Sequence, residues 1–293
     1  MTIKNSFLII FFFLFVSAAF AQVVEGVDYV AILRSASYDP KDNKIIPAEF
    51  TYESSNDTVL VTLRKKYKLD SIAGFGNEVS RILNLLHWVH NTVKHDGVTV
   101  RDVGIINADE ILKNAITNDI GVSCGELAIT LNDCYLAMGV PSRKIYCFPK
   151  DSLHKDADSH VINIVYISSK KKWIWVDPTH DAYVMNEKGA LLSIEEVRER
   201  LIKNKPLIVN PDANWNRRVS DTKENYLNKY MAKNLYRMYC PIASEYGTPD
   251  FNTNKSNYVE LVPADYYKQS RYKDDKRIIT SNPKQFWALP GDN

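Results

Sequence analysis

A helix that begins at a cysteine and is followed by strand-like runs most constrains the fold of this chain. Ser123 and Glu126 have the spacing of a capping box, so the helix is expected to begin at Cys124. Apolar residues then recur at helical spacing, and Gly139 and Pro141 end the pattern. Three strand-like runs follow, at residues 144–148, 160–166 and 172–176. Helices followed by antiparallel strands, without β-α-β alternation, predict an α+β fold in which the cysteine helix packs on an antiparallel sheet.

The remaining patterns predict further helices on both sides of this region. They are expected at residues 79–93, 107–115, 221–233 and from Ser193 onward. Residues 59–63 show a short apolar alternation, and nine of the 17 tyrosines lie between Tyr226 and Tyr272. We divide the chain into a signal peptide at 1–21, an N-terminal segment at 22–74, a core at 75–185, and a helical and tyrosine-rich β extension at 186–293 that packs on the core.

The composition excludes several classes of protein. Hydrophobic residues make up 45% and charged residues 25% of the chain, as in soluble globular proteins. The net charge is only +2, so no nucleic-acid partner is expected. Four cysteines are too few for a disulfide scaffold in a chain of 293 residues.

The first residues have the order of a secretory signal peptide. Lys4 precedes an apolar run at residues 7–16, and Ala19 and Ala21 are the small residues expected before a cleavage point. The alternative is a membrane anchor, but a spanning helix needs about 20 apolar residues. We therefore expect cleavage after Ala21, a mature chain without an integral membrane segment, and a secreted or periplasmic location.

Cys124 is the candidate nucleophile. The first turn of a helix offers free N–H groups and the positive end of the helix dipole, and both favour the thiolate. The N–H of Cys124 could also bind an oxyanion. The alternatives are a buried cysteine or half of a disulfide. Ten residues of helix, about 15 Å, exclude Cys134 as its partner, whereas Cys147 and Cys240 stay open.

A hairpin is expected to place a base and its orienting carboxylate side by side. If residues 167–170 form the loop, His160 lies opposite Asp177 on one face of the sheet. Singly, a surface histidine and a turn aspartate would be the simpler interpretations. The same register pairs other residues along the two strands: Ile162 with Trp175, and Ile164 with Trp173.

Four ordered motifs resemble the transglutaminase-like superfamily, relatives of the papain-like fold, in the form of its secreted bacterial members. They are residues 121–126 (Gly-Val-Ser-Cys-Gly-Glu), 139–143 (Gly-Val-Pro-Ser-Arg), the strand-opening His160, and 173–179 (Trp-Ile-Trp-Val-Asp-Pro-Thr). The resemblance implies Cys124 as nucleophile, His160 as general base and acid, and Asp177 as the orienting carboxylate. Many members have an aromatic residue two positions after the histidine, where this chain has Ile162. Relatives supply a second oxyanion donor from the segment before the cysteine, where Trp88 is a candidate, although a core position is its simpler interpretation.

Other polar clusters are weaker candidates for binding sites. His87, His90 and His95, with Asp96, could form a zinc set, but no cysteine pair supports it. The acidic loop at residues 151–158 lacks the spacing of a calcium loop. Arg143 could bind a substrate carboxylate, but a structural anchor is the better interpretation. We therefore expect no metal and no cofactor.

Three functions are compatible with these motifs. The first is a secreted cysteine peptidase or amidase, in which a thioester on Cys124 is resolved by water. The second is a true protein-glutamine gamma-glutamyltransferase, in which an amine replaces water. The third is a catalytically silent module that binds peptide or glycan. The expected partner is a peptide or protein substrate, with cell-wall peptides and glycopeptides among the candidates.

Overall fold

The computed structural model describes residues 26–42, 49–97, 106–150, 159–247, 258–266 and 277–291. The expected signal peptide and the acidic loop at residues 151–158 lie outside these ranges. Across the described part of the chain, no helix combines the length and the apolar character needed to span a membrane.

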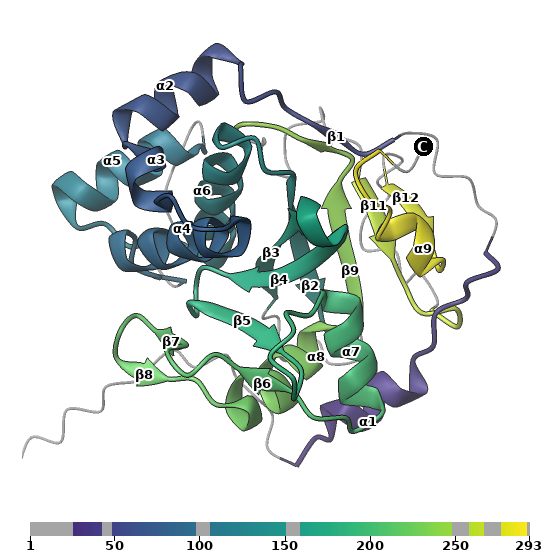
Figure 1. Ribbon diagram of the computed structural model, residues 1–293. Coiled ribbons are helices and arrows are strands. Elements are labelled where there is room, and N and C mark those ends of the chain that lie inside the picture. Colours follow the sequence, from purple (N-terminus) through teal and green to yellow (C-terminus); the bar gives the residue numbers. More distant parts are fainter. Residues whose placement is uncertain are drawn as a thin grey trace, which may run out of the picture.

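One mixed sheet of eight strands forms the centre of the molecule (Figure 1). All neighbouring strands are antiparallel except the parallel pair at one edge, β11 and β12. In spatial order the strands are β12 (Arg277–Thr280), β11 (Tyr258–Leu261), β9 (Arg237–Pro241), β2 (Ser142–Phe148), β3 (His160–Ile167), β4 (Lys172–Asp177), β5 (Ala182–Met185) and β6 (Ile208–Val209). The α+β fold is therefore confirmed, and strands of the C-terminal extension continue the sheet of the core.

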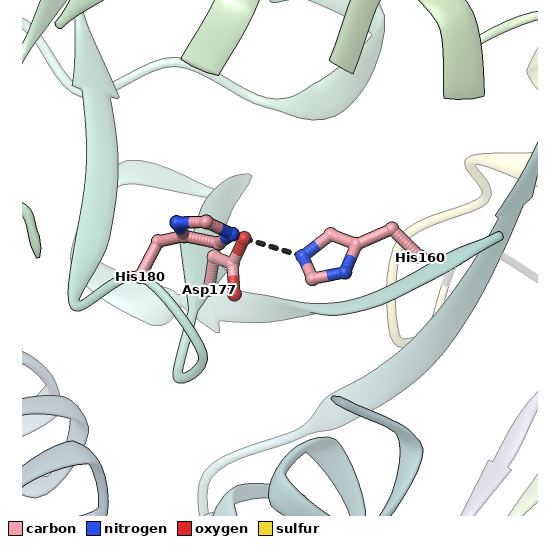
Figure 2. A group of neighbouring side chains, drawn as sticks. All are labelled: His160, Asp177 and His180. Atoms are coloured by element: carbon pink, nitrogen blue, oxygen red, sulfur yellow. Dashed lines mark hydrogen bonds and ion pairs between the residues drawn. The ribbon is translucent and has the colours of Figure 1, made fainter. Parts of the chain in front are cut away.

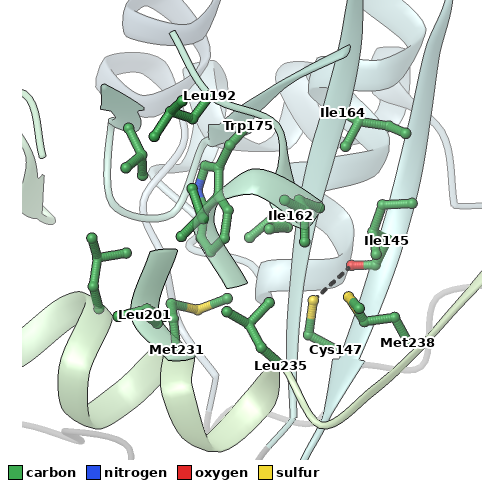
Figure 3. Close-up of a cluster of buried hydrophobic side chains, with 14 of the residues drawn as sticks. Ile145, Cys147, Ile162, Ile164, Trp175, Leu192, Leu201, Met231, Leu235 and Met238 are labelled. Atoms are coloured by element: carbon green, nitrogen blue, oxygen red, sulfur yellow. Dashed lines mark hydrogen bonds between the residues drawn. The ribbon is translucent and has the colours of Figure 1, made fainter. Parts of the chain in front are cut away.

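Two apolar cores cover the two faces of this sheet. Because side chains alternate along a strand, Ile162 and Ile164 enter one core while Val165 enters the other. One core lies under α2 (Thr58–Lys66), α3 (Leu69–Ala73), α4 (Glu78–Thr92), α5 (Ala108–Asn118) and α6 (Cys124–Ala137). The other lies under α1 (Tyr29–Ser35), α7 (Ile194–Ile202), the π-helix Lys223–Met231 and α8 (Ala232–Asn234), and is drawn in Figure 3. Both faces are covered, which explains why β3 is apolar almost throughout.

The cysteine helix α6 is more deeply buried than its sequence pattern suggested. Every residue from Leu127 to Ala137 is buried, polar ones included, so the helix is surrounded on all sides. Asp133 accepts N–H hydrogen bonds from Ala108 at 3.0 Å and from Gly247 at 3.2 Å. These contacts tie the buried part of α6 to its neighbours, and its first turn is the part that reaches the surface.

The hairpin of β3 and β4 has a different register from the predicted one. Ile164 pairs with Trp175 and Tyr166 with Trp173, so the predicted pairs Ile162–Trp175, Ile164–Trp173 and His160–Asp177 are wrong by two residues. A short 3₁₀ turn at Ser168–Lys170 moves the loop one position along the chain. A shift of two residues preserves the face of each side chain. His160 and Asp177 therefore still share one face of the sheet.

Two short strand pairs lie outside the main sheet, and Arg143 links the core to the extension. The strand β1 (Thr51–Tyr52) pairs with β10 (Ala243–Ser244), and β7 (Asn214–Trp215) pairs with β8 (Val219–Ser220). The buried guanidinium of Arg143 donates to the carbonyls of Phe286 and Ala288, at 3.0 and 3.1 Å, in and just after α9 (Pro283–Phe286). Arg143 is thus a structural anchor, as expected.

Candidate active site

Cys124 is the first residue of α6, and the predicted capping box holds this turn. The Ser123 hydroxyl accepts the Glu126 N–H at 3.3 Å, and the Glu126 carboxylate accepts the Ser123 N–H at 2.9 Å. All four cysteines are free, so the disulfide alternatives for Cys124 are excluded in this structure. Cys124 is partly exposed, whereas the other three cysteines are buried. It is therefore the accessible thiol.

His160 and Asp177 form a buried pair at the end of the hairpin (Figure 2). The Nε2–H of His160 donates to Oδ2 of Asp177 at 2.7 Å. Their side chains are 1% and 0% exposed, so water does not compete for this bond. The other carboxylate oxygen accepts the N–H of Thr179 at 2.9 Å. The carboxylate is thereby fixed in position by main chain as well as by the imidazole.

The charges of the pair shift both of its pKa values. Burial alone would lower the pKa of His160, but the charge of Asp177, its hydrogen bond and the nearby Cys124 raise it to about 10. Burial alone would raise the pKa of Asp177, but the charges of His160 and His180 and the hydrogen bonds from His160 and Tyr226 hold it well below its usual range. The pair is therefore an imidazolium and a carboxylate near neutral pH.

Cys124 approaches the same imidazole. The interaction of His160 with Cys124 contributes to the raised pKa of His160, after the larger contribution of Asp177. Because Asp177 occupies Nε2, the nitrogen left for the thiol is Nδ1, which is buried and has no hydrogen-bond partner among the described residues. Catalytic hydrogen bonds are often loose in a free enzyme and shorten when substrate binds. The structure thus brings together the three residues that the sequence singled out.

Four further residues surround the pair and were missed by sequence reasoning. His180 packs edge-on against His160 at 5.5 Å, and its Nδ1–H donates to Asp221 at 2.8 Å. The ring of Tyr230 lies 5.1 Å from His160. The hydroxyl of Tyr226 donates to Asp177 at 2.6 Å. For Tyr226 and Tyr230 the only signal was the tyrosine-rich composition between Tyr226 and Tyr272, which does not say where the tyrosines pack. His180 and Asp221 had no such signal.

The residues around the pair fit proton transfer better than metal binding. His160, Asp177 and His180 could each offer a ligand atom, within 4.8 Å of one another. A ligating histidine must be neutral, but Asp177 holds His160 in its protonated form. The Oδ2 atom of Asp177 also already accepts hydrogen bonds from His160 and Tyr226.

The histidines of the zinc alternative do not converge on one point. His87 pairs with Asp181 at 2.6 Å. His90 contacts the carbonyl of Pro178 at 3.0 Å, and its Nε2 lies 3.1 Å from Asn214. His95 is hydrogen-bonded to Trp215 at 3.0 Å. Each imidazole therefore has separate partners within the part of the chain that the structure describes.

Trp88, the candidate oxyanion donor, lies in a different environment from the pair. Its ring packs 6.2 Å from that of Tyr67 and against the core under α2 to α6. This is the core position that its place on an amphipathic helix suggested. Within the described residues, the ring of Trp88 contacts neither Cys124 nor His160.

The comparisons with known proteins agree with the motifs. Residues 65–178 match the family model described as the transglutaminase-like superfamily. The resemblance is thus confirmed over these residues. The matched family is one of thiol enzymes. Among curated proteins, none matches the sequence.

Two solved structures are similar in fold over part of the chain. One is a proposed cysteine protease from Cytophaga hutchinsonii, with 21% identity, a TM-score of 0.32, and coverage of 51% of this chain and 46% of that one. The other is a proposed protease from Parabacteroides distasonis ATCC 8503, with 21% identity, a TM-score of 0.27, and coverage of 45% and 28%. The chain therefore spans less than half the length of either protein.

Proposed function

We propose that this protein is a secreted thiol enzyme that hydrolyses peptide or amide bonds through Cys124, His160 and Asp177. The observation that carries the proposal is the fully buried hydrogen bond of 2.7 Å between His160 and Asp177. The same imidazole of His160 also interacts with the accessible Cys124. A nucleophile, a base and a group that orients the base are the parts that covalent catalysis requires.

The first half of the reaction forms a thioester on Cys124. The thiolate attacks the carbonyl carbon, and the π electron pair of the carbonyl moves to its oxygen. When that pair returns, the bond to the leaving amine breaks, and the imidazolium of His160 gives the amine its proton from Nδ1. Asp177 keeps Nε2 protonated and fixes the ring plane through the 2.7 Å bond.

The second half of the reaction frees the enzyme. Neutral His160 takes a proton from water as the water oxygen attacks the thioester carbon. Collapse of this intermediate releases a carboxylic acid and returns the thiolate to Cys124, beside a protonated His160. Replacement of water by an amine would make the same site a transglutaminase, and the acylation step would be identical.

The test is labelling by an activity-directed acylating probe, followed by mass spectrometry of the modified peptide. Wild-type protein should be labelled at Cys124, and Cys124→Ala should not be labelled. Cys134→Ala is the matched control, because it removes a buried cysteine from the same helix. Equal labelling of wild type and Cys124→Ala would exclude the enzymatic proposal and leave the binding module.

The product released from the thioester distinguishes hydrolysis from transfer to an amine. Release of free acid in water, with no added amine, would support hydrolysis. Release only when a primary amine is present would support transfer. We expect free acid.

A further inference from the structure

The segment that carries His95 runs beside the start of the cysteine helix. The N–H of Asp96 donates to the carbonyl of Val122 at 2.7 Å, and the N–H of Val122 donates to that of Lys94 at 2.8 Å. These bonds form a parallel bridge that pairs His95 with Val122, two residues before Cys124. A Cβ on Gly121 would lie 2.9 Å from that of Asp96, so only glycine permits this close approach.

Asn216 binds the main chain of His95, and Trp215, the last residue of β7, binds its ring. Asn216 accepts the N–H of His95 at 2.7 Å and donates to its carbonyl at 2.9 Å. The indole N–H of Trp215 donates to Nδ1 of His95 at 3.0 Å. An indole nitrogen can only donate, so Nδ1 must be the unprotonated nitrogen. The proton of the neutral ring is therefore on Nε2.

The surroundings of His95 keep the ring neutral. Burial lowers the pKa of His95, and the positive charges of His160 and His180 lower it further, to about 4. His95 is therefore close enough to both imidazoles for their charges to act on it. His95 therefore keeps its Nε2–H donor at the pH at which His160 is protonated.

The Nε2 edge of the ring is left uncovered by a glycine. A Cβ at Gly97 would lie 3.2 Å from Cε1 and 3.4 Å from Nε2 of His95. The backbone of Gly97 has no left-handed conformation that would itself demand glycine. Within the described ranges, no hydrogen bond to Nε2 is formed, whereas Nδ1 is occupied. A donor of fixed tautomer is thus available on this edge.

We propose that His95 is a catalytic residue whose Nε2–H, together with the main-chain N–H of Cys124, binds the oxyanion formed when the thiolate attacks the carbonyl. This inference rests on the proposed function and replaces Trp88 in that role. A neutral imidazole donates to the oxygen without giving up its proton, so no atom is transferred at this position. Trp215 and Asn216 are positioning residues that fix the ring.

The experiment compares two reactions of Cys124 that differ in their need for an oxyanion donor. Acylation by p-nitrophenyl acetate passes through an oxyanion. Its rate is measured from the burst of nitrophenolate release. Alkylation by iodoacetamide passes through none and reports only thiolate reactivity. The variants are His95→Leu, His95→Gln, which keeps an N–H donor, and Trp215→Phe, which keeps the ring contact. Trp88→Phe is the matched control for the other candidate donor.

His95→Leu should lower the acylation rate about 100- to 1,000-fold, the usual effect of removing an oxyanion donor, and leave alkylation unchanged. His95→Gln should lose less, and Trp88→Phe should resemble wild type. Wild-type ¹⁵N NMR spectra should show His95 protonated at Nε2, and Trp215→Phe should weaken this preference. Equal acylation by wild type and His95→Leu would overturn the inference, as would an equal fall in both reactions. Absence of acylation in wild type would instead refute the proposed function.

Discussion

Tyr226 donates its hydroxyl hydrogen to the carboxylate oxygen of Asp177 that also accepts the Nε2–H of His160. The two donors lie 2.6 and 2.7 Å from that oxygen. Tyr226 in turn accepts the indole N–H of Trp175 at 3.1 Å. A residue of the C-terminal extension thereby completes the hydrogen bonding of a core carboxylate that has no access to water.

Tyr226→Phe should destabilise the protein by about 1.5–3 kcal/mol, the usual value for a hydrogen bond to a charged group. The low pKa of Asp177 contributes stability that is present above the unfolded pKa of about 3.9 and is lost as pH falls toward the folded value. The variant has a smaller pKa shift, so its difference from wild type should narrow in acid. Urea unfolding as a function of pH measures this effect, with Tyr166→Phe as control. A difference that stays constant in acid would argue against the link to Asp177.

Asp177→Asn should slow the alkylation of Cys124 about 10- to 100-fold near neutral pH. This loss corresponds to the free energy of one hydrogen bond to a charged group. The loss should shrink above the ordinary thiol pKa of about 8.5, because an unassisted thiol is then largely ionised. His160→Ala should show a larger loss, and Cys124→Ala should abolish labelling at that position. Alkylation rate against pH, with mass spectrometry of the modified peptide, is the measurement. Superimposable profiles for wild type and both substitutions would make Cys124 an ordinary cysteine.

The stability of the protein should fall as pH rises from about 6.5 to about 10. The pKa of His160 is raised to about 10 in the folded state. Its stabilisation is therefore fully present below the unfolded pKa of about 6.5 and is lost as pH rises through the folded value. Unfolding free energies of wild type and His160→Gln should converge across this window. Asp133 and Lys144 also titrate there, but they do so in both proteins and cancel in the difference. A constant difference would contradict the raised pKa.

Material recovered outside the cytoplasm should begin at Gln22. The proposed cleavage point follows the small residues Ala19 and Ala21, so replacing both with leucine should leave the precursor uncleaved. N-terminal sequencing of each form is the check. Recovery of exported wild-type protein that still carries Met1 would refute the assignment.

Local patterns were sufficient to predict the helices of the core. The start of α5 coincides with the predicted cap Asn107, and α4 begins one residue before the predicted Val79. In the extension, α7 starts after the predicted cap Ser193. Residues 59–63, by contrast, lie in the helix α2 rather than in an alternating strand. Five residues are too short a window to distinguish the two periodicities.

The register of the hairpin could not be read locally. Lys171 has a left-handed backbone with φ 47°, which a lysine rarely adopts. The turn is held from outside, because the Glu78 carboxylate at the start of α4 accepts the N–H groups of Ser168 and Ser169 at 2.7 and 3.0 Å. The contact of Glu78 with this turn joins residues far apart in the chain, so the sequence pattern of neither strand indicates it.

The residues of the candidate site were predictable only where they begin or end a helix or strand. Cys124, His160 and Asp177 each begin or end a helix or strand, and that position is visible in sequence. Tyr226 and His95 owe their positions to tertiary packing. A single tyrosine or histidine looks the same in sequence whether or not its hydrogen bonds reach such a site.

The sheet order also determines when the site can be completed during synthesis. The strand β2 lies between β3, which follows it directly, and β9, which comes much later in the chain. The pairing of β2 with β9 closes a long loop, and the entropy lost in closing that loop opposes its formation. As the chain leaves the ribosome, Cys124 and His160 emerge well before Tyr226. The carboxylate of Asp177 thus acquires its full set of partners only at a late stage of folding, after the tyrosine-rich segment has been made.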